Sequence, residues 1–209
     1  MKALIIVDVQ NDFLPGGALA VPQGDEVIEP INRLSAAFPI LVATQDWHPP
    51  DHASFAASHP GKQPGDAIML DGIEQRLWPV HCVQDTPGAE FHADLEHLRA
   101  AHVVRKGTDP EVDSYSGFFD NHRLRATGLD GLLRQQGVSK VYIAGLATDY
   151  CVKFTALDAV QLGFKTYVIP EASRGVNLQP SDSDNALQEM QAAGVVPLSV
   201  DEAIRHAAR

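Results

Sequence analysis

The chain has 209 residues, 44% of them hydrophobic, which suits a single globular domain over residues 1–209 with a sizeable core. A formal net charge of −11 excludes a basic nucleic-acid-binding surface and argues against a membrane partner. Two cysteines and an N-terminal apolar run too short for a secretory signal or a transmembrane helix predict a cytoplasmic protein with reduced thiols.

Short apolar runs rich in valine and isoleucine recur along the chain. Their continuity, without alternation between polar and apolar residues, is typical of strands that are buried on both faces. The strands predicted in this way cover residues 2–8, 39–44, 102–106, 140–145, 165–170 and 195–200.

Helical patterns separate these strands. One helix is predicted directly after Asp25. Three further helices are predicted over residues 128–137, 149–163 and 181–194, and Gly137 and Gly194 are predicted to cap the C-termini of the first and last of these three. Regular strand-helix alternation predicts an α/β fold with a mostly parallel sheet covered by helices. Residues 45–91 break this rhythm, because they are dense in Pro, Gly, His and Asp, and a loop of that length is usually functional.

Polar side chains follow several strands at the point where each strand ends. In a doubly wound sheet, ligands bind beyond the carboxyl ends of the strands, so these side chains are expected to lie together. In chain order they are Asp8, the pair Asp46 and His48, Lys106, and Cys151. The sequence therefore predicts an acid, a metal-binding pair, a cation and a thiol at one edge of the sheet.

Cys151 lies in "ATDYC" at the start of a predicted helix, where amide N–H groups and the helix dipole favour a thiolate. Gly145 would allow the backbone turn that exposes it. Asp8 could accept the thiol proton, and Lys106 could hold both groups in their charged forms. Each residue also has an ordinary structural alternative. Cys151 could be a buried structural cysteine, Asp8 could cap a loop, and Lys106 could be an exposed lysine at the end of a strand.

Asp46 and His48 are two residues apart, so on an extended segment their side chains face the same way. His81 could complete a set of two nitrogens and one carboxylate, which suits an accessible zinc, iron or manganese ion. Loop hydrogen bonding is the alternative for this set. His52 is either an additional ligand or a residue behind the ligands.

Four aromatic residues lie beside these polar groups in the sequence. They are Phe13, Trp78, Tyr115 and Tyr150. Packing in the core is the ordinary role of such residues, but their loop positions favour the walls of a pocket for a flat ring.

Several segments together resemble the nicotinamidases, which belong to the isochorismatase-like cysteine hydrolases. These segments are "ALIIVDVQNDFLPGGAL", "DWHPPDHASFA", "WPVHC", "YSGF" and "GLATDYCV", and the resemblance runs from about residue 2 to Ala172. It implies a three-layer α/β/α sandwich around a mostly parallel six-stranded sheet. The implied activity is hydrolysis of nicotinamide to nicotinate and ammonia through a cysteine thioester, which feeds NAD salvage, with pyrazinamide as an expected analogue.

The resemblance also implies roles for individual residues. Asp8, Lys106 and Cys151 match the catalytic triad, and Asp46, His48 and His81 match the ligands of one divalent ion, zinc or else iron or manganese. Leu146–Ala147 falls at a cis peptide, with the Ala147 and Cys151 amides as an oxyanion hole. Phe13, Trp78 and Tyr115 match positions around the pyridine ring, and Tyr150 stands where some relatives have histidine. A homo-oligomer is compatible with the sequence.

Three other functions remain open from the sequence alone. One is an amidase for N-carbamoyl or ureido compounds, and another is a metal-dependent phosphatase with Asp8 as its nucleophile. The third is a regulator that binds nicotinamide without hydrolysing it.

Overall fold

The six predicted strands form one parallel sheet in the computed structural model of the protein, which describes residues 1–208. They are β1 (Lys2–Val7), β2 (Ile40–Asp46), β5 (His102–Lys106), β6 (Lys140–Leu146), β7 (Lys165–Arg174) and β8 (Val196–Pro197). Their order across the sheet is β5-β2-β1-β6-β7-β8, and every neighbouring pair is parallel. The predicted α/β sandwich is therefore confirmed.

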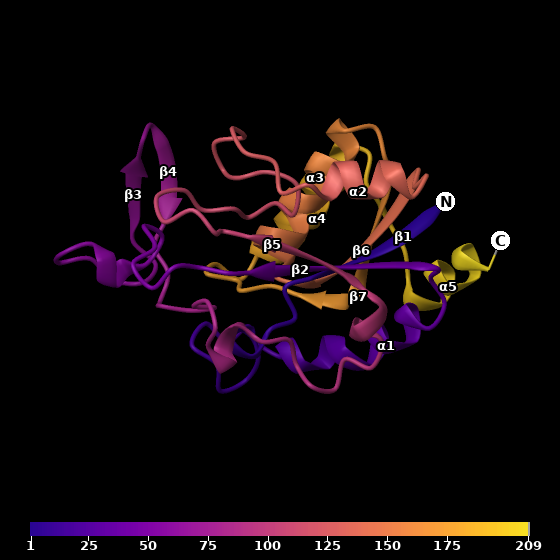
Figure 1. The fold of residues 1–209 in the computed structure, drawn as a ribbon, viewed down its shortest axis with the longest axis horizontal. Helices are drawn as coiled ribbons and strands as arrows, with labels where there is room; N and C mark the ends of the chain where they lie inside the picture. The colour runs from indigo at the N-terminus through magenta and orange to yellow at the C-terminus, as the bar shows by residue number, and fades with distance from the viewer. Residues whose placement is uncertain (209) are drawn as a thin grey trace.

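Helices cover both faces of this sheet (Figure 1). On one face lie α1 (Ile28–Ser35) and α5 (Val200–Ala207), and on the other lie α2 (Leu129–Gln135), α3 (Lys153–Gln161) and α4 (Asp182–Ala192). Alternate residues of β1 supply the two apolar cores, because successive side chains of a strand point to opposite faces. Leu4 packs in the core under α1, whereas Ile5 packs in the core under α2 and α3. Within residues 1–208, none of the helices has the length and apolar character needed to cross a bilayer.

The centre and the edges of the sheet differ in burial. The side chains of β2 are buried along its whole length, as predicted, but β5 is an edge strand and exposes His102, Val103 and Arg105. At the other edge, the predicted strand over residues 195–200 shrinks to the two residues of β8. The chain turns there into α5, a helix that was not predicted.

Helix α5 begins at a capping box. The Ser199 side chain accepts a hydrogen bond from the Glu202 N–H at 3.2 Å, and the Glu202 carboxylate accepts one from the Ser199 N–H at 2.9 Å. These contacts satisfy N–H groups that a helix start leaves without partners. They explain why the apolar residues up to Val200 do not all continue as a strand.

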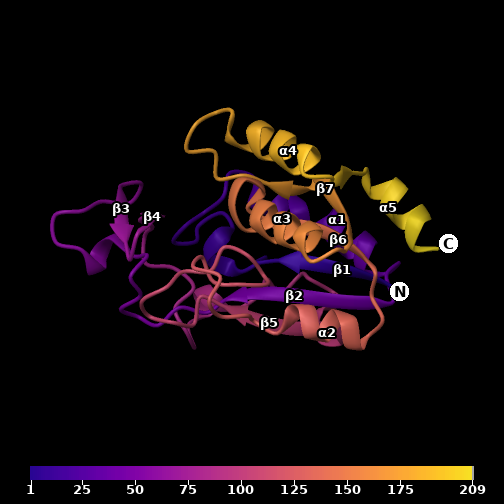
Figure 2. The same cartoon turned by 90° about the horizontal axis from the view of Figure 1, so that it is seen from above.

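Residues 45–91 contain a short antiparallel hairpin that was also not predicted. Its strands are β3 (Ala67–Leu70) and β4 (Ile73–Arg76), and they are joined at Asp71 and Gly72, whose φ angles are 45° and 86°. The hairpin extends beyond the sheet, at the end of the molecule opposite the N-terminus and α5 (Figures 1 and 2). It therefore lies on the side where the parallel strands end.

Candidate active site

Four neighbouring strands each deliver one of the predicted reactive groups. In sheet order the groups are Lys106 at the end of β5, Asp46 at the end of β2, Asp8 directly after β1, and Cys151 in the turn after β6. The register places Asp46 opposite Lys106. Adjacent strands lie about 4.7–4.9 Å apart, so parallel pairing alone brings residues that are distant in sequence to one place. These groups gather at the carboxyl end of β1, which lies between β2 and β6. The strand order reverses direction at this point, where ligands of doubly wound sheets usually bind.

Cys151 lies in a single π-helical turn, Thr148–Val152, and not in the first turn of an α-helix as predicted. Helix α3 begins two residues later, and the Tyr150 and Val152 N–H groups both donate to the Ala147 carbonyl at 3.1 Å. The peptide between Leu146 and Ala147 is cis. Cys151 is 7% exposed and belongs to a core cluster, but it also lines a pocket, so its side chain is not sealed from that pocket.

Gly145 was predicted to allow a backbone turn, and its positive φ is a conformation that favours glycine. It lies within β6 with a φ of +124°, and a Cβ at this position would be 2.2 Å from the Val7 carbonyl oxygen. Glycine is therefore required because the backbones of β6 and β1 approach closely just before Asp8 and Cys151.

Lys106 is the cation at the centre of the cluster. Its Nζ lies 2.9 Å from Asp8 Oδ2, 2.5 Å from Asp46 Oδ1 and 3.4 Å from Cys151 Sγ. The side chain is fully buried, so it is not an exposed strand-end lysine. Burial opposes its charge, but Asp46 and Asp8 outweigh burial and raise the pKa of Lys106 well above its usual value. The ammonium therefore stays charged.

The pKa values of Asp8 and Cys151 are both raised above their usual values. Burial raises the pKa of Asp8 to about 6, although Lys106 and a 2.6 Å hydrogen bond from Thr44 oppose the shift. Burial also raises the pKa of the Cys151 thiol well above its usual value, against the attraction of Lys106. The expectation that the helix start favours a thiolate is thus outweighed by desolvation, and the thiol needs a base when it reacts.

Asp46, His48 and His81 form a cluster that could hold a metal ion, with their ligand atoms all within 4.8 Å of one another. The Nε2 atoms of His48 and His81 lie 3.6 Å and 4.0 Å from Asp46 Oδ2. His48 Nδ1 faces the Gly107 carbonyl at 2.9 Å, and His81 Nδ1 faces the Pro79 carbonyl at 2.7 Å. Because a carbonyl only accepts, both rings carry a proton on Nδ1 and turn Nε2, the atom that would bind a metal, toward Asp46.

The backbone around His48 is shaped to hold its ring. Gly107 has a φ of +62°, and a Cβ there would lie 2.4 Å from His48 Cε1. The Asp46 carboxylate uses one oxygen for Lys106 and turns the other to the imidazoles. Burial opposes its ionisation, but Lys106 and His48 hold the pKa of Asp46 well below its usual range. An ionised carboxylate with two imidazole nitrogens fits a divalent ion such as zinc.

His52 lies behind this cluster. Its ring centroid is 4.2 Å from that of His48, and the residue is fully buried. Burial and the neighbouring His48 lower the pKa of His52 to about 4, so the ring is neutral. Its ring nitrogens are bonded differently from those of His48 and His81, because Nδ1 lies 2.7 Å from Ser54 Oγ.

All five residues expected to contact a substrate line one pocket, together with Asp46, His81 and Cys151. These five are Phe13, Trp78, Tyr115, Ala147 and Tyr150. The Phe13 ring lies 5.5 Å from the His81 ring, and Trp78 meets Tyr150 edge-on at 4.9 Å. The aromatic side chains therefore enclose a space between the metal cluster and the thiol.

Sequence reasoning missed three polar residues of this site. Gln75, on β4, donates through Nε2 to Tyr115 Oη and to Asp113 Oδ2, both at 3.1 Å. Asp149 accepts from the backbone N–H groups of Val176 and Asn177 at 2.9 Å and 2.7 Å. The hairpin thus braces the aromatic wall, and Asp149 fixes the loop that bears Val176 against the turn that carries Cys151.

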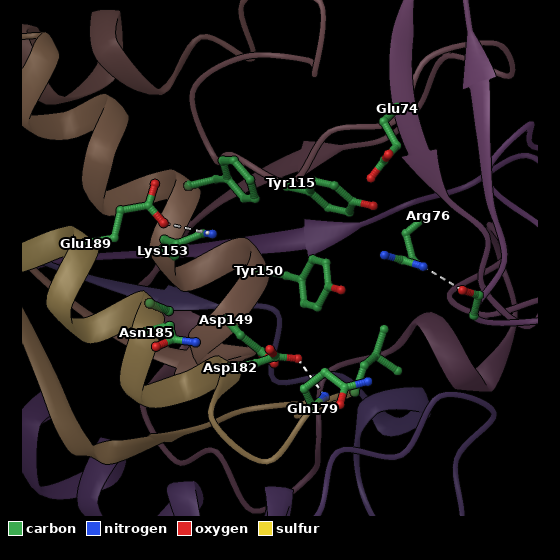
Figure 3. A pocket seen from close by; sticks show the side chains of 14 residues that line it. Glu74, Arg76, Tyr115, Asp149, Tyr150, Lys153, Gln179, Asp182, Asn185 and Glu189 are labelled. Carbon is green, nitrogen blue, oxygen red and sulfur yellow. Dashed lines mark hydrogen bonds and ion pairs between the residues drawn. The ribbon is translucent and has the colours of Figure 1, made fainter.

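A second, more open groove of about 610 Å³ adjoins the pocket and shares Tyr115 and Tyr150 with it (Figure 3). Glu74 and Arg76 reach it from the hairpin. Its remaining charged groups come from the turn after β6 and from α3 and α4, including Lys153, which pairs with Glu189 at 3.1 Å. Of the three strand-end groups Asp8, Lys106 and Cys151, only Cys151 lines the narrower pocket.

This chain is similar to known proteins over nearly its whole length. Residues 2–202 match the isochorismatase domain family. The chain is 51% identical to a nicotinamidase of Escherichia coli, over 92% of each chain. A nicotinamidase/pyrazinamidase structure from Acinetobacter baumanii superposes with a TM-score of 0.93 at 50% identity, covering 96% of this chain and 97% of the other. A pyrazinamidase of Pyrococcus horikoshii in complex with zinc gives a TM-score of 0.78 at 42% identity, covering 95% and 98%.

The fold, the strand-end triad and these matches together define the class of protein: the chain belongs to the isochorismatase domain family. Within that family its similarity is to the nicotinamidases, which confirms the resemblance found in the sequence. The protein is therefore an amidohydrolase.

Proposed function

We propose that this amidohydrolase is a nicotinamidase, which converts nicotinamide and water to nicotinate and ammonia. The observation that carries the proposal is the position of Cys151 Sγ, 3.4 Å from Lys106 Nζ, in a pocket walled by Phe13, Trp78 and Tyr115. A flat heteroaromatic amide suits such walls. The same activity on pyrazinamide is expected, because pyrazine has the shape of pyridine. We place the reaction in cytoplasmic NAD salvage.

The metal cluster lies on one side of this pocket. Asp46, His48 and His81 would hold one divalent ion, and two nitrogens with one carboxylate suit zinc and leave coordination positions open. When bound, the ion would supply a positive anchor for the pyridine nitrogen, directly or through a water molecule. A pyridine ring anchored there would direct its carboxamide toward Cys151, so that binding would also position the reacting carbon.

The first half of the reaction acylates the cysteine. Asp8 accepts the thiol proton while Cys151 Sγ forms a bond to the carboxamide carbon. Lys106 lies beside both groups and compensates the negative charge on the sulfur. The N–H groups of Ala147 and Cys151 donate to the oxyanion. Asp8 then returns the proton to the amide nitrogen, the carbon–nitrogen bond breaks, and ammonia leaves a thioester behind.

The second half hydrolyses the thioester. Asp8 removes a proton from water, and the water oxygen bonds to the thioester carbon, with the oxyanion held by the same two amides. When the carbon–sulfur bond breaks, Asp8 returns the proton to Cys151, and nicotinate leaves after losing its own proton to solvent. A single carboxylate with a raised pKa thus serves as acid and base in turn.

An ammonia-release assay with nicotinamide tests the proposal. We expect turnover by the wild-type protein and its loss in Cys151→Ala, with survival within tenfold of wild type as the contrary result. Cys82→Ala is the matched control, because Cys82 is a second buried free thiol that does not line the pocket. Thiol alkylation and chelation should each abolish turnover.

The same assay separates the other functions. A phosphatase with Asp8 as nucleophile would lose activity to a chelator but not to alkylation. An amidase for ureido compounds would prefer those substrates to nicotinamide. A regulator would bind nicotinamide without releasing ammonia.

A further inference from the structure

Two tyrosines form the boundary between the pocket and the open groove beside it. Tyr115 and Tyr150 line both spaces, and the groove has a volume of about 610 Å³. The reaction proposed above uses only the pocket and the groups that lie behind it. The groove therefore has space next to the reacting groups and no role in the hydrolysis of nicotinamide itself.

The two tyrosines are held differently. Tyr115 is fixed, because its Oη accepts hydrogen bonds from Trp78 Nε1 and from Gln75 Nε2, both at 3.1 Å. Tyr150 is half-buried, and its hydroxyl points along the groove toward Arg76 (Figure 3). Tyr150 is therefore the wall residue whose side chain can turn into the groove and join the two spaces.

A pyridine-3-carboxamide has one ring position that points away from both of its reacting ends. Under the proposed function, the ring nitrogen faces Asp46 and His81, and the carboxamide at C3 faces Cys151. Ring carbon C5 is adjacent to neither the nitrogen nor C3, so a substituent there extends away from both. None of these three residues lines the groove. The groove is therefore the open space into which a C5 substituent can extend.

The groove contains more carboxylates than cations (Figure 3). Its carboxylates are Glu74, Asp149, Asp182 and Glu189, and its cations are Arg76 and Lys153. Both cations already have partners. Lys153 Nζ lies 3.1 Å from Glu189 Oε2 and 4.8 Å from the centre of the Phe154 ring, and Arg76 Nη1 donates to the Gly65 carbonyl at 2.7 Å. A positively charged substituent is therefore favoured in the groove over a negatively charged one.

We propose that this protein also hydrolyses pyridine-3-carboxamides that carry a short cationic arm at C5, with the arm held in the groove beyond Tyr150. Water is added across the same carbon–nitrogen bond, ammonia leaves, and the arm is unchanged. This inference rests on the proposed function, because the ring must be oriented between the metal cluster and Cys151. It makes the groove a specificity site that nicotinamide does not fill.

Three compounds of similar size test the proposal. They are the 5-aminomethyl, 5-hydroxymethyl and 5-carboxy derivatives of nicotinamide, whose substituents are cationic, neutral and anionic at pH 7. In ammonia-release assays with the wild-type protein, we expect kcat/KM to be highest for the aminomethyl compound and to fall by about threefold at each step, the size of an exposed charge interaction. In about 1 M salt, where screening acts within about 3 Å, the differences should shrink.

The outcomes separate this inference from the proposed function. Hydrolysis of nicotinamide but of none of the three derivatives would overturn the inference alone, as would an equal or reversed order of the two charged compounds. Failure to hydrolyse nicotinamide itself would instead contradict the proposed function.

A charge reversal in the groove gives a second test. In Glu74→Lys, the ratio of kcat/KM for the aminomethyl compound to that for the carboxy compound should fall by about tenfold, because the change acts on both charged arms in opposite directions. Effects of the substituents on the amide itself are the same in both proteins and cancel. Glu29→Lys, on α1 and outside the groove, is the matched control and should leave the ratio within about twofold.

Calorimetric titration of the Cys151→Ala forms measures the same preference as a ratio of affinities, without turnover. An unchanged ratio in Glu74→Lys would overturn the role of the groove. If that variant does not fold, the order of the three compounds with the wild-type protein still decides.

Discussion

The pocket at the strand ends and the groove beside it contain the same kinds of residue and share two tyrosines, yet they differ in burial. Behind the pocket, Lys106 is fully buried between Asp8 and Asp46. In the groove, Lys153 pairs with Glu189, and their side chains are 18% and 55% exposed. Removal from water changes the proton affinities in the pocket, whereas water screens the groove. Burial at the strand ends therefore sets the proton affinities of these charged residues.

The largest contrast is expected from matched lysine variants. Lys106→Met leaves two buried carboxylates without their cation and should lower the free energy of unfolding by about 3–5 kcal/mol, with loss of turnover. Lys153→Met removes an ion pair that is partly in solvent and should cost at most about 1 kcal/mol. Urea denaturation at pH 7 measures both. Similar losses in the two variants would mean that burial does not separate the two regions.

The next effect concerns pH. Asp8 must be ionised to act as a base, and its pKa is raised to about 6, so kcat/KM should fall as the pH drops through 6, by about tenfold per unit below it. Asp8→Asn should lose about 10²–10⁴ in kcat at pH 7. Asp182→Asn, in the groove, should stay within about twofold of wild type, a surface effect of at most about 0.5 kcal/mol. Full activity of the wild type down to pH 5 would exclude Asp8 as the base.

A glycine pair tests the support of the metal site. Gly107→Ala places a methyl group against the His48 ring and should weaken zinc binding by about 10–100-fold, as expected when the partner of a ligand is displaced. Gly131→Ala has open space around it in α2 and should leave zinc binding unchanged. Chelator competition measures both affinities. A Gly107→Ala protein with wild-type affinity would show that the ring does not depend on this backbone.

The smallest effect is expected where the hairpin meets the pocket. Gln75→Leu removes the donor to Tyr115 Oη and should raise KM for nicotinamide by about fivefold, the equivalent of one hydrogen bond, with a smaller change in kcat. Asn185→Ala, which lines only the groove, is the matched control. Initial-rate kinetics with nicotinamide measure KM and kcat for both variants. A fall in kcat without a change in KM would assign Gln75 to the chemical step.

The sequence predicted the sheet and the meeting of the strand-end groups, because continuous apolar runs mark buried strands and parallel strands end at one edge. Asp8, Lys106 and Cys151 needed no further information to be placed together. The hairpin could have been found from Asp71–Gly72, a pair typical of tight hairpin turns. Helix α5 could have been found from Ser199 and Glu202, which have the spacing of a capping box.

Other features could not be read from the sequence. The contact of Lys106 with Asp46 joins the triad to the metal cluster, and it depends on two side chains that approach only after the strands pair. The burial of His52 against the His48 ring depends on how the loop after β2 packs. The neutral state of Cys151 depends on how far it is buried. Partners and burial of this kind belong to tertiary structure, and local patterns do not contain them.

The bridge made by Lys106 has a consequence for redesign. One ammonium, that of Lys106, contacts both Asp8 and Asp46. A metal ion of different charge bound at Asp46 would therefore change the proton affinity of Asp8 through this single side chain. Transferring the cysteine site to another scaffold would therefore require β5, which carries the lysine, together with the two strands that lead to Asp8 and Asp46. Replacing the metal ion would therefore also change the reactivity of the cysteine.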